Sequence, residues 1–138
     1  MSVNDVVVTE VITADSNTAI ADVAARMKSE NVGSVLVLDE SELVGILTDR
    51  DVALSLADDP DATDRRAGDV MTEDPVTVGP DASVFELLER MDSVGVRRMP
   101  VVEDGTVAGI VALDDVLGLL AEEFEDAMDV VDRQSPAF

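Results

Sequence analysis

Thr48 and Asp51 place a hydroxyl and a carboxylate three residues apart, after an apolar run and at the start of a helix-like stretch. This spacing is typical of an N-terminal helix cap, which needs no ligand. The same two groups could also converge on a sugar diol, with helix amides nearby to attract an anion. A second segment, residues 109–115, has the same Gly, Ile and Asp but carries Ala112 in place of the hydroxyl.

The two segments belong to an internal repeat. A shift of 64 residues aligns residues 5–56 with residues 69–120 without a gap, through turns as well as helices. An ungapped register of this kind indicates a duplication, in which each repeat is half of one domain. Identical pairs include Asp5/Asp69, Thr13/Thr77, Arg26/Arg90, Gly45/Gly109 and Asp51/Asp115.

The composition indicates a folded and strongly acidic protein. The 138 residues include 31 acidic and 9 basic side chains, a formal net charge of −22, and 46% are hydrophobic. This charge disfavours nucleic acids and anionic membranes, since phosphate binding depends on Lys and Arg. A carboxylate-rich, lysine-poor surface suits very high salt, which screens self-repulsion. We therefore interpret the chain as a cytoplasmic protein of a halophile.

The composition also limits the chemistry. The chain has no Cys and no His, so it lacks a thiol nucleophile, thiolate ligands and an imidazole base. No apolar run approaches the length that spans a bilayer, and the acidic clusters match no calcium-binding loop. We therefore expect no enzyme, no catalytic residues, no metal site and no obligatory cofactor.

Each repeat is expected to fold as strand–helix–strand–strand–helix. In the first repeat, apolar periodicity predicts a helix over 19–30, strands over 34–38 and 43–47, and a helix over 49–57. The last helix of the second repeat is expected to run from about 113 towards 131, before a frayed tail over 133–138. The fold class is therefore α+β, with repeat 1 at 5–61, a linker at 62–68, repeat 2 at 69–125, and a helix end and tail at 126–138.

These features together resemble a tandem pair of CBS (cystathionine-β-synthase) domains. The resemblance rests on the two Gly-Ile-x-x-x-x-Asp segments, on residues 97–102 (Arg-Arg-Met-Pro-Val-Val) and on residues 69–72 (Asp-Val-Met-Thr). It covers residues 5 to about 122. It implies a regulatory module of two β-α-β-β-α repeats packed about a pseudo-twofold axis. In this family, two clefts between the repeats bind AMP, ADP, ATP or S-adenosylmethionine.

The resemblance also implies which residues form the better cleft. Asp51 would accept hydrogen bonds from the ribose diol, and Thr48 would contact ribose or phosphate. Arg97 or Arg98 would pair with phosphate, where the guanidinium fork is favoured. The alternative for these two arginines is ion pairing with neighbouring carboxylates. Apolar side chains would enclose the adenine, and the full expected set is Ile46, Thr48, Asp51, Thr72, Val76, Val96, Arg97 and Arg98.

The second cleft departs from this pattern. Ala112 removes the hydroxyl, and residues 33–34 (Gly-Ser) stand where the second repeat has Arg97 and Arg98. The carboxylate is retained at Asp115. We therefore expect unequal sites, of which the second is weaker and takes a phosphate-poor ligand or none. Its expected residues are Ile12, Val32, Ser34, Ile110 and Asp115.

Two functions remain open at this point. The favoured one is a sensor of adenosine-containing ligands that passes a conformational change to an unknown effector protein. The alternative is an interaction or scaffold module whose clefts are vestigial. In either case the resemblance favours a homodimer, and an apolar set could form its contact or pack within the monomer: Val52, Leu56, Val116, Leu119, Leu120 and Phe124.

Overall fold

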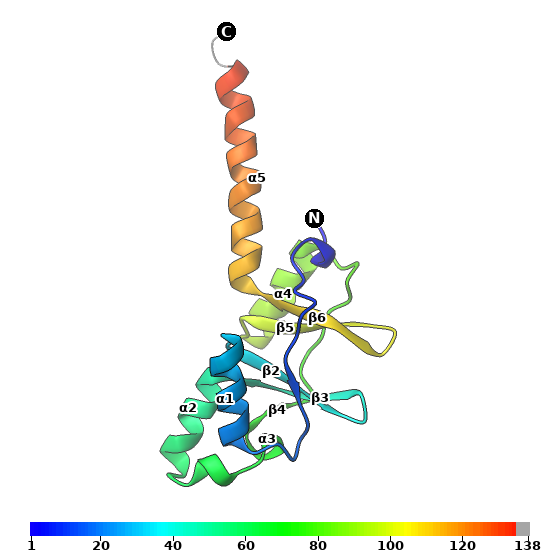
Figure 1. Cartoon of the computed structure of the whole chain (residues 1–138). Coiled ribbons are helices and arrows are strands. Elements are labelled where there is room, and N and C mark those ends of the chain that lie inside the picture. The colour runs from blue at the N-terminus through cyan, green and yellow to red at the C-terminus, as the bar shows by residue number, and fades with distance from the viewer. Residues whose placement is uncertain (135–138) are drawn as a thin grey trace.

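The computed structural model describes residues 1–134 and consists of two similar halves (Figure 1). A 3-10 helix, η1 (Val3–Asp5), precedes the first half. The first half contains β1 (Thr13–Ala14), α1 (Ile20–Glu30), β2 (Ser34–Asp39), β3 (Glu42–Thr48) and α2 (Asp49–Asp58). The connection contains η2 (Ala62–Asp64), α3 (Ala67–Val70) and β4 (Thr72–Glu73). The second half contains α4 (Val84–Val94), β5 (Arg98–Glu103), β6 (Thr106–Ala112) and α5 (Leu113–Gln134).

The predicted α+β class and the order of the main elements are confirmed, with one local correction. The final helix continues to Gln134, so Arg133 and Gln134 are helical rather than frayed; residues 135–138 of the predicted tail lie outside the described residues. The segment predicted as a linker, residues 62–68, contains η2 and the start of α3. Ala62 and Ala67 are both fully buried, because η2 and α3 pack within the first half.

The two sheets have equivalent strand pairings, related by the 64-residue repeat. The first has the order β1-β2-β3-β4, in which β1 is parallel to β2 and the other pairs are antiparallel. The second contains β5 and β6, extended by a parallel bridge from Val78 to Val101 and an antiparallel bridge from Val8 to Ile110. Val78 and Val8 occupy the repeat positions of β1 and β4. The order of the four paired segments is therefore the same in both halves.

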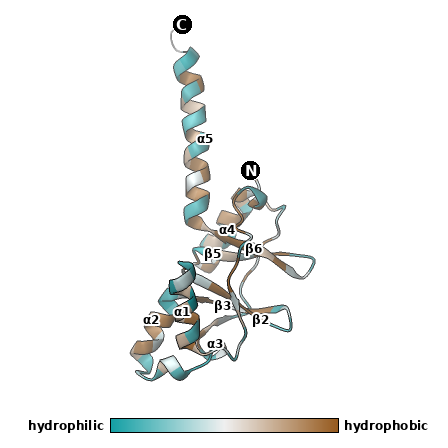
Figure 2. Ribbon diagram, in the orientation of Figure 1, coloured by the Kyte–Doolittle hydropathy of each residue, from teal (hydrophilic) through white to brown (hydrophobic). Residues whose placement is uncertain are grey.

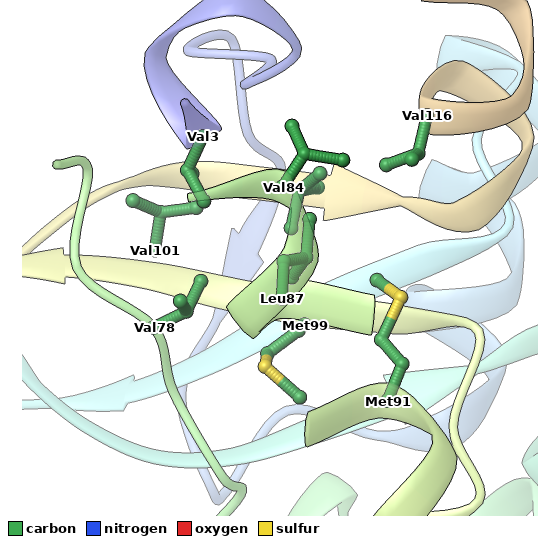
Figure 3. Close-up of a cluster of buried hydrophobic side chains, with 9 residues drawn as sticks. Val3, Val78, Val84, Leu87, Met91, Met99, Val101 and Val116 are labelled. Atoms are coloured by element: carbon green, nitrogen blue, oxygen red, sulfur yellow. The ribbon is translucent and has the colours of Figure 1, made fainter. Parts of the chain in front are cut away.

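Each half is completed by the segment that precedes the other half. Val3, from the N-terminus, is fully buried in the second core beside Val101 and Val84 (Figure 3). Its repeat equivalent, Ala67, is buried in the first core, which contains Ile20. The duplicated sequence units, 5–61 and 69–125, are therefore not the packing units. We call residues 3–8 and 67–72 the lead-ins of the first and second half. Each lead-in packs on the other half, so neither repeat has a complete core alone.

The repeated glycines make this exchange possible. A side chain at Gly45 would overlap Met71, whose Cγ would be 2.8 Å from the added Cβ. At Gly109 an added Cβ would overlap the backbone of Val8 and the side chain of Val7. In each half the crossing lead-in runs directly over the glycine. The Gly-Ile pairs identified in the sequence thus have a structural role next to the expected ligand segment.

Substituting Gly45→Ala should destabilise the protein by about 1–3 kcal/mol, because the added methyl group has no space beneath the crossing lead-in. Gly79→Ala is the matched control, since no atom lies within 4 Å of a Cβ at that position. Urea denaturation at constant salt measures both. If the two variants had equal urea midpoints, the lead-in would be able to move away from the added methyl group without loss of stability.

An arginine-to-carbonyl hydrogen bond also occurs at equivalent positions in both halves. The Arg26 guanidinium donates to the Thr13 carbonyl at 3.3 Å, and Arg90 donates to the Thr77 carbonyl at 2.6 Å. Each arginine therefore ties the first helix of its half to the extended segment before it. In the first half only, Asp39 also accepts from the Ser16 amide and hydroxyl, and these hydrogen bonds lower its pKa.

Helix α5 extends well beyond the second half (Figures 1 and 2). Its start is anchored by Val116, which is fully buried in the second core. From residue 121 to residue 134 every side chain is exposed. Within residues 1–134, no helix combines the length and the apolar character needed to cross a membrane.

Candidate functional site

A cavity of about 520 Å³ lies between the two halves. This volume is within the usual range of small-molecule sites. Its walls come from the β3–α2 junction, from β4 and the segment after it, and from the α4–β5 connection. All eight residues expected for the main site line this one cavity: Ile46, Thr48, Asp51, Thr72, Val76, Val96, Arg97 and Arg98.

The strand register explains how the two repeats meet here. Ile46 of β3 pairs with Thr72 of β4, so the second lead-in runs beside the strand that ends at Thr48. The following residues, Pro75 and Val76, continue along the wall of the cavity. Exchange of the lead-ins therefore brings residues of the second repeat to the polar segment of the first.

Thr48 and Asp51 form a capping box at the start of α2. The Thr48 amide donates to Asp51 Oδ2 at 2.9 Å, and the Asp51 amide donates to Thr48 Oγ1 at 3.1 Å. The capping interpretation is thus correct, and both residues also line the cavity. Asp51 Oδ1 accepts no hydrogen bond from residues 1–134. One carboxylate oxygen is therefore available for a ligand while the other supports the helix.

The helix amides are less available than the sequence indicated. The Asp49 amide donates to the Gly33 carbonyl at 3.0 Å, and the Arg50 amide donates to Asp49 Oδ1 at 2.8 Å. The Asp51 amide is bonded to Thr48, as described above. Since the first three amides of α2 have acceptors, the expectation that they attract an anion is wrong. The start of α2 therefore offers an anion no free amide among these three.

The two predicted arginines differ in their contacts. Arg97 donates to Asp114 Oδ1 at 2.8 Å, and the side chains of this pair are 74% and 75% exposed. The Arg98 side chain makes no hydrogen bond or ion pair with residues 1–134. Its guanidinium passes over Gly33, where an added Cβ would be 2.8 Å from Arg98 Nη2. Ion pairing, the alternative raised from sequence, thus applies to Arg97 and not to Arg98.

The cavity is locally positive in a very acidic protein. Three of the chain's nine basic residues line it, namely Arg50, Arg97 and Arg98. Two carboxylates, Asp49 and Asp51, also line it. The lining thus carries three positive and two negative charges, a net charge of +1, against −22 for the whole chain. The arginines are concentrated where a phosphate could approach them.

Six lining residues were not identified from the sequence. Some could have been found, because Asp49 and Arg50 lie between the two predicted polar residues at the start of a helix. Gly95 ends α4 in the left-handed conformation, with φ 78°, and so turns the chain towards β5. That turn was not recognised as a cavity wall. The complete set is Asp49, Arg50, Pro75, Val94, Gly95 and Pro100.

The residues expected for the second cleft do not line this cavity. Ile110 of β6 pairs with Val8, which is the repeat equivalent of the Ile46–Thr72 contact. Asp115 is exposed in the first turn of α5, and no residue of 1–134 hydrogen-bonds to its side chain. Ile12, Val32 and Ser34 are partly buried. The strand pairing of the first half is therefore repeated here, but the equivalent positions lack the hydroxyl and the two arginines.

The apolar set considered for a dimer contact is not one exposed face. Val116 is fully buried in the second core, and Val52 packs against the first core. Leu119 and Leu120 are partly buried against the second core. Only Leu56 and Phe124 of that set are strongly exposed. Packing within the monomer, the alternative named above, accounts for the other four.

Comparison with known proteins identifies the repeats. Residues 3–58 and 67–122 each match the family described as CBS domain. The chain is 35% identical over 115 residues to the CBS domain-containing protein YhcV of Bacillus subtilis, covering 83% of this chain and 82% of that protein. It is 34% identical over 116 residues to inosine-5'-monophosphate dehydrogenase of Methanocaldococcus jannaschii, but that match covers only 22% of the enzyme.

Solved structures share the fold. The CBS domain pair of protein MJ0100, in complex with 5'-methylthioadenosine and S-adenosyl-L-methionine, superposes with a TM-score of 0.81 at 30% identity. The superposition covers 89% of this chain and 98% of that one. The putative acetoin utilization protein AcuB of Vibrio cholerae superposes with a TM-score of 0.78 at 22% identity, which supports the fold alone.

Proposed function

This chain belongs to the CBS domain family, as a tandem pair of CBS domains, and on that premise we propose that it is a regulatory sensor of adenine nucleotides. The ligand occupies the cavity between the halves, where Ile46, Val76 and Val96 enclose the adenine. Asp51 accepts hydrogen bonds from the ribose, and the arginines hold the phosphate. The MJ0100 pair, which was solved with two adenosine derivatives, supports an adenosine-containing ligand.

One observation carries the proposal. One cavity brings together the apolar walls, a carboxylate with one oxygen that has no partner among residues 1–134, and three arginines of a chain with nine basic residues. These groups suit the three parts of a nucleotide: a flat apolar base, a diol that donates hydrogen bonds, and an anion. Guanidinium groups favour phosphate through paired hydrogen bonds.

The same charges favour AMP over S-adenosylmethionine. The sulfonium group of S-adenosylmethionine is positive and would lie near the arginines, whereas the AMP phosphate would pair with them. Because opposite charges attract and like charges repel at close range, we expect the AMP complex to be the tighter one. ADP and ATP add phosphates that must extend towards the open side of the cavity.

Calorimetric titration with AMP, ADP, ATP, S-adenosylmethionine and adenosine tests the function. We expect AMP to bind more tightly than adenosine and S-adenosylmethionine. At a hundredfold excess over its dissociation constant, the ligand should stabilise the folded protein by about 2.7 kcal/mol, a clear shift in Tm. If none of the five ligands bound measurably at low or at high salt, the result would support the scaffold alternative instead.

Arg97 connects the cavity to the start of α5. It lines the cavity and also binds Asp114 in the first turn of α5. In addition, the Leu113 amide donates to the Arg97 carbonyl at 2.8 Å, so the start of α5 is tied to this residue twice. A phosphate that recruits the Arg97 guanidinium would release Asp114 and change the support of α5. We propose this exchange as the signal passed to an effector protein.

Substituting Asp114→Asn should raise AMP affinity about 1.5- to 5-fold, because an exposed ion pair that competes with the phosphate contributes about 0.2–1 kcal/mol. Asp126→Asn makes the same charge change further along α5 and is the control. Calorimetry at constant salt measures both. An unchanged affinity in Asp114→Asn, or an equal rise in the control, would mean that Arg97 does not exchange partners.

A further inference from the structure

Gly33 lies directly against the guanidinium of Arg98. A Cβ added at Gly33 would be 2.8 Å from Arg98 Nη2 and 3.3 Å from Arg98 Cζ. Both residues are partly buried, and Arg98 also lines the cavity between the two halves. The absence of a side chain at residue 33 thus leaves the space that the guanidinium occupies.

The backbone itself does not require a glycine at this position. Gly33 is not among the glycines in the left-handed region, where a side chain would be strained. Its repeat equivalent in the second half is Arg97, and the same backbone hydrogen bond forms in both halves. The Asp49 amide donates to the Gly33 carbonyl at 3.0 Å, and the Leu113 amide donates to the Arg97 carbonyl at 2.8 Å. A side chain is therefore compatible with this backbone, and the contact that excludes one is Arg98.

The backbone around Gly33 is fixed by its neighbours. Ser34, the next residue, pairs with Thr48 in the β2–β3 ladder, and the Gly33 carbonyl is bonded to Asp49 as described. A methyl group at residue 33 would therefore displace the end of the flexible Arg98 side chain rather than the backbone. Since ordinary van der Waals contact begins at 3.4 Å, Arg98 Nη2 would have to move by about 0.6 Å.

The Asp49 carboxylate favours this placement of Arg98. Asp49 Oδ2 would be 3.3 Å from the same added Cβ, and Arg98 Nη2 would be 2.8 Å from it, so the two charged groups lie within about 6 Å of each other. No ion pair forms between them in the part of the chain that the structure describes. Opposite charges attract at this separation without a direct hydrogen bond. The guanidinium is thus held beside Gly33 while its N–H groups stay free for a phosphate.

From these contacts we infer that Gly33 is a positioning residue of the nucleotide site, which acts through Arg98. This inference rests on the proposed function, because it assigns the guanidinium to a phosphate. A guanidinium binds phosphate best through two parallel hydrogen bonds, so a displaced fork loses part of that interaction. Gly33 thereby contributes to the selectivity for AMP over adenosine, which has no phosphate for Arg98 to bind.

Calorimetric titration of Gly33→Ala with AMP and with adenosine tests this inference. We expect AMP affinity to fall about 3- to 10-fold, because one of the two hydrogen bonds of the fork is weakened, and adenosine affinity to stay within about twofold. Gly79→Ala is the matched control, since no atom lies within 4 Å of a Cβ at that position, and it should leave both affinities unchanged. The two variants should have similar urea midpoints, because only the end of a flexible side chain has to move.

A second pair of variants separates an effect through Arg98 from a general effect on the fold. In the Arg98→Ala background, Gly33→Ala should change AMP affinity by less than about twofold, because the displaced group is absent. Equal losses in both backgrounds, or equal AMP affinities of Gly33→Ala and Gly79→Ala, would overturn the inference and leave the nucleotide site standing. If the wild-type chain did not bind AMP, the proposed function itself would be wrong, and this inference with it.

Discussion

Replacing Arg98 with alanine should weaken AMP binding by about 10- to 100-fold and leave adenosine binding within about twofold. Arg98 lines the cavity, and its side chain has no hydrogen bond or ion pair within residues 1–134, so the guanidinium can pair with a phosphate without giving up a polar partner. A hydrogen bond to a charged group contributes about 1.5–3 kcal/mol, and each 1.4 kcal/mol is about tenfold in affinity. Adenosine has no phosphate, so it provides the internal reference.

The large effect is expected because the helix amides cannot compensate. The first amides of α2 already donate to Gly33, to Asp49 and to Thr48. Arg97 can help only by giving up Asp114, so Arg97→Ala should cost less than Arg98→Ala. Calorimetric titration of each variant with both ligands measures these differences.

Arg133→Ala, on the exposed part of α5, is the matched control, since it makes the same change in net charge far from the cavity along the chain. It should leave both ligands unaffected. If Arg98→Ala weakened AMP and adenosine equally, Arg98 would be maintaining the shape of the cavity rather than contacting phosphate.

Local patterns predicted most of the fold. The spacing of Ile20, Val23 and Met27 predicted α1. All three are buried, as expected for a helix face that packs on a core. The alternation of apolar runs and turns gave both hairpins. The duplication, read from the ungapped register, predicted that both halves would share one strand order. These signals lie within short stretches of sequence, so they can be read without knowledge of distant contacts.

The exchange of lead-ins could not be predicted from such patterns. Val3 and Ala67 are small apolar residues next to turns, and nothing local shows that each is buried in the opposite half. The resemblance to the family supplied the cross-repeat cleft that local reading lacked. The occupied amides of α2 were also missed, because the acceptor for the Asp49 amide is Gly33, which is distant in sequence.

Asp51→Ala should weaken AMP binding by about 10- to 100-fold, whereas Asp115→Ala, at the equivalent repeat position, should leave it unchanged. Asp51 lines the cavity, and its Oδ1 has no partner among residues 1–134, so this oxygen can accept from the ribose diol. Charged acceptors give hydrogen bonds of about 1.5–3 kcal/mol. Asp115 belongs to the half whose cleft lacks the hydroxyl and the arginines.

Asp51 also caps α2, so loss of the cap must be separated from loss of the ligand contact. Removing a cap costs about 0.5–2 kcal/mol of stability, which urea denaturation measures directly. Thr48→Ala disrupts the same capping box but keeps both carboxylate oxygens, so it should lose similar stability and less affinity. Equal losses of affinity in the two variants would assign the effect of Asp51 to the helix cap.

The diol itself provides the sharpest comparison. The wild-type protein should bind AMP more tightly than 2',3'-dideoxy-AMP, because the dideoxy sugar has no hydroxyl to donate to Asp51. In Asp51→Ala this preference should disappear, and the two ligands should bind with similar, weaker affinity. A preference that survives in the variant would mean that another group recognises the ribose. Equal binding of the two ligands by the wild-type protein would remove the sugar contact from the proposed site.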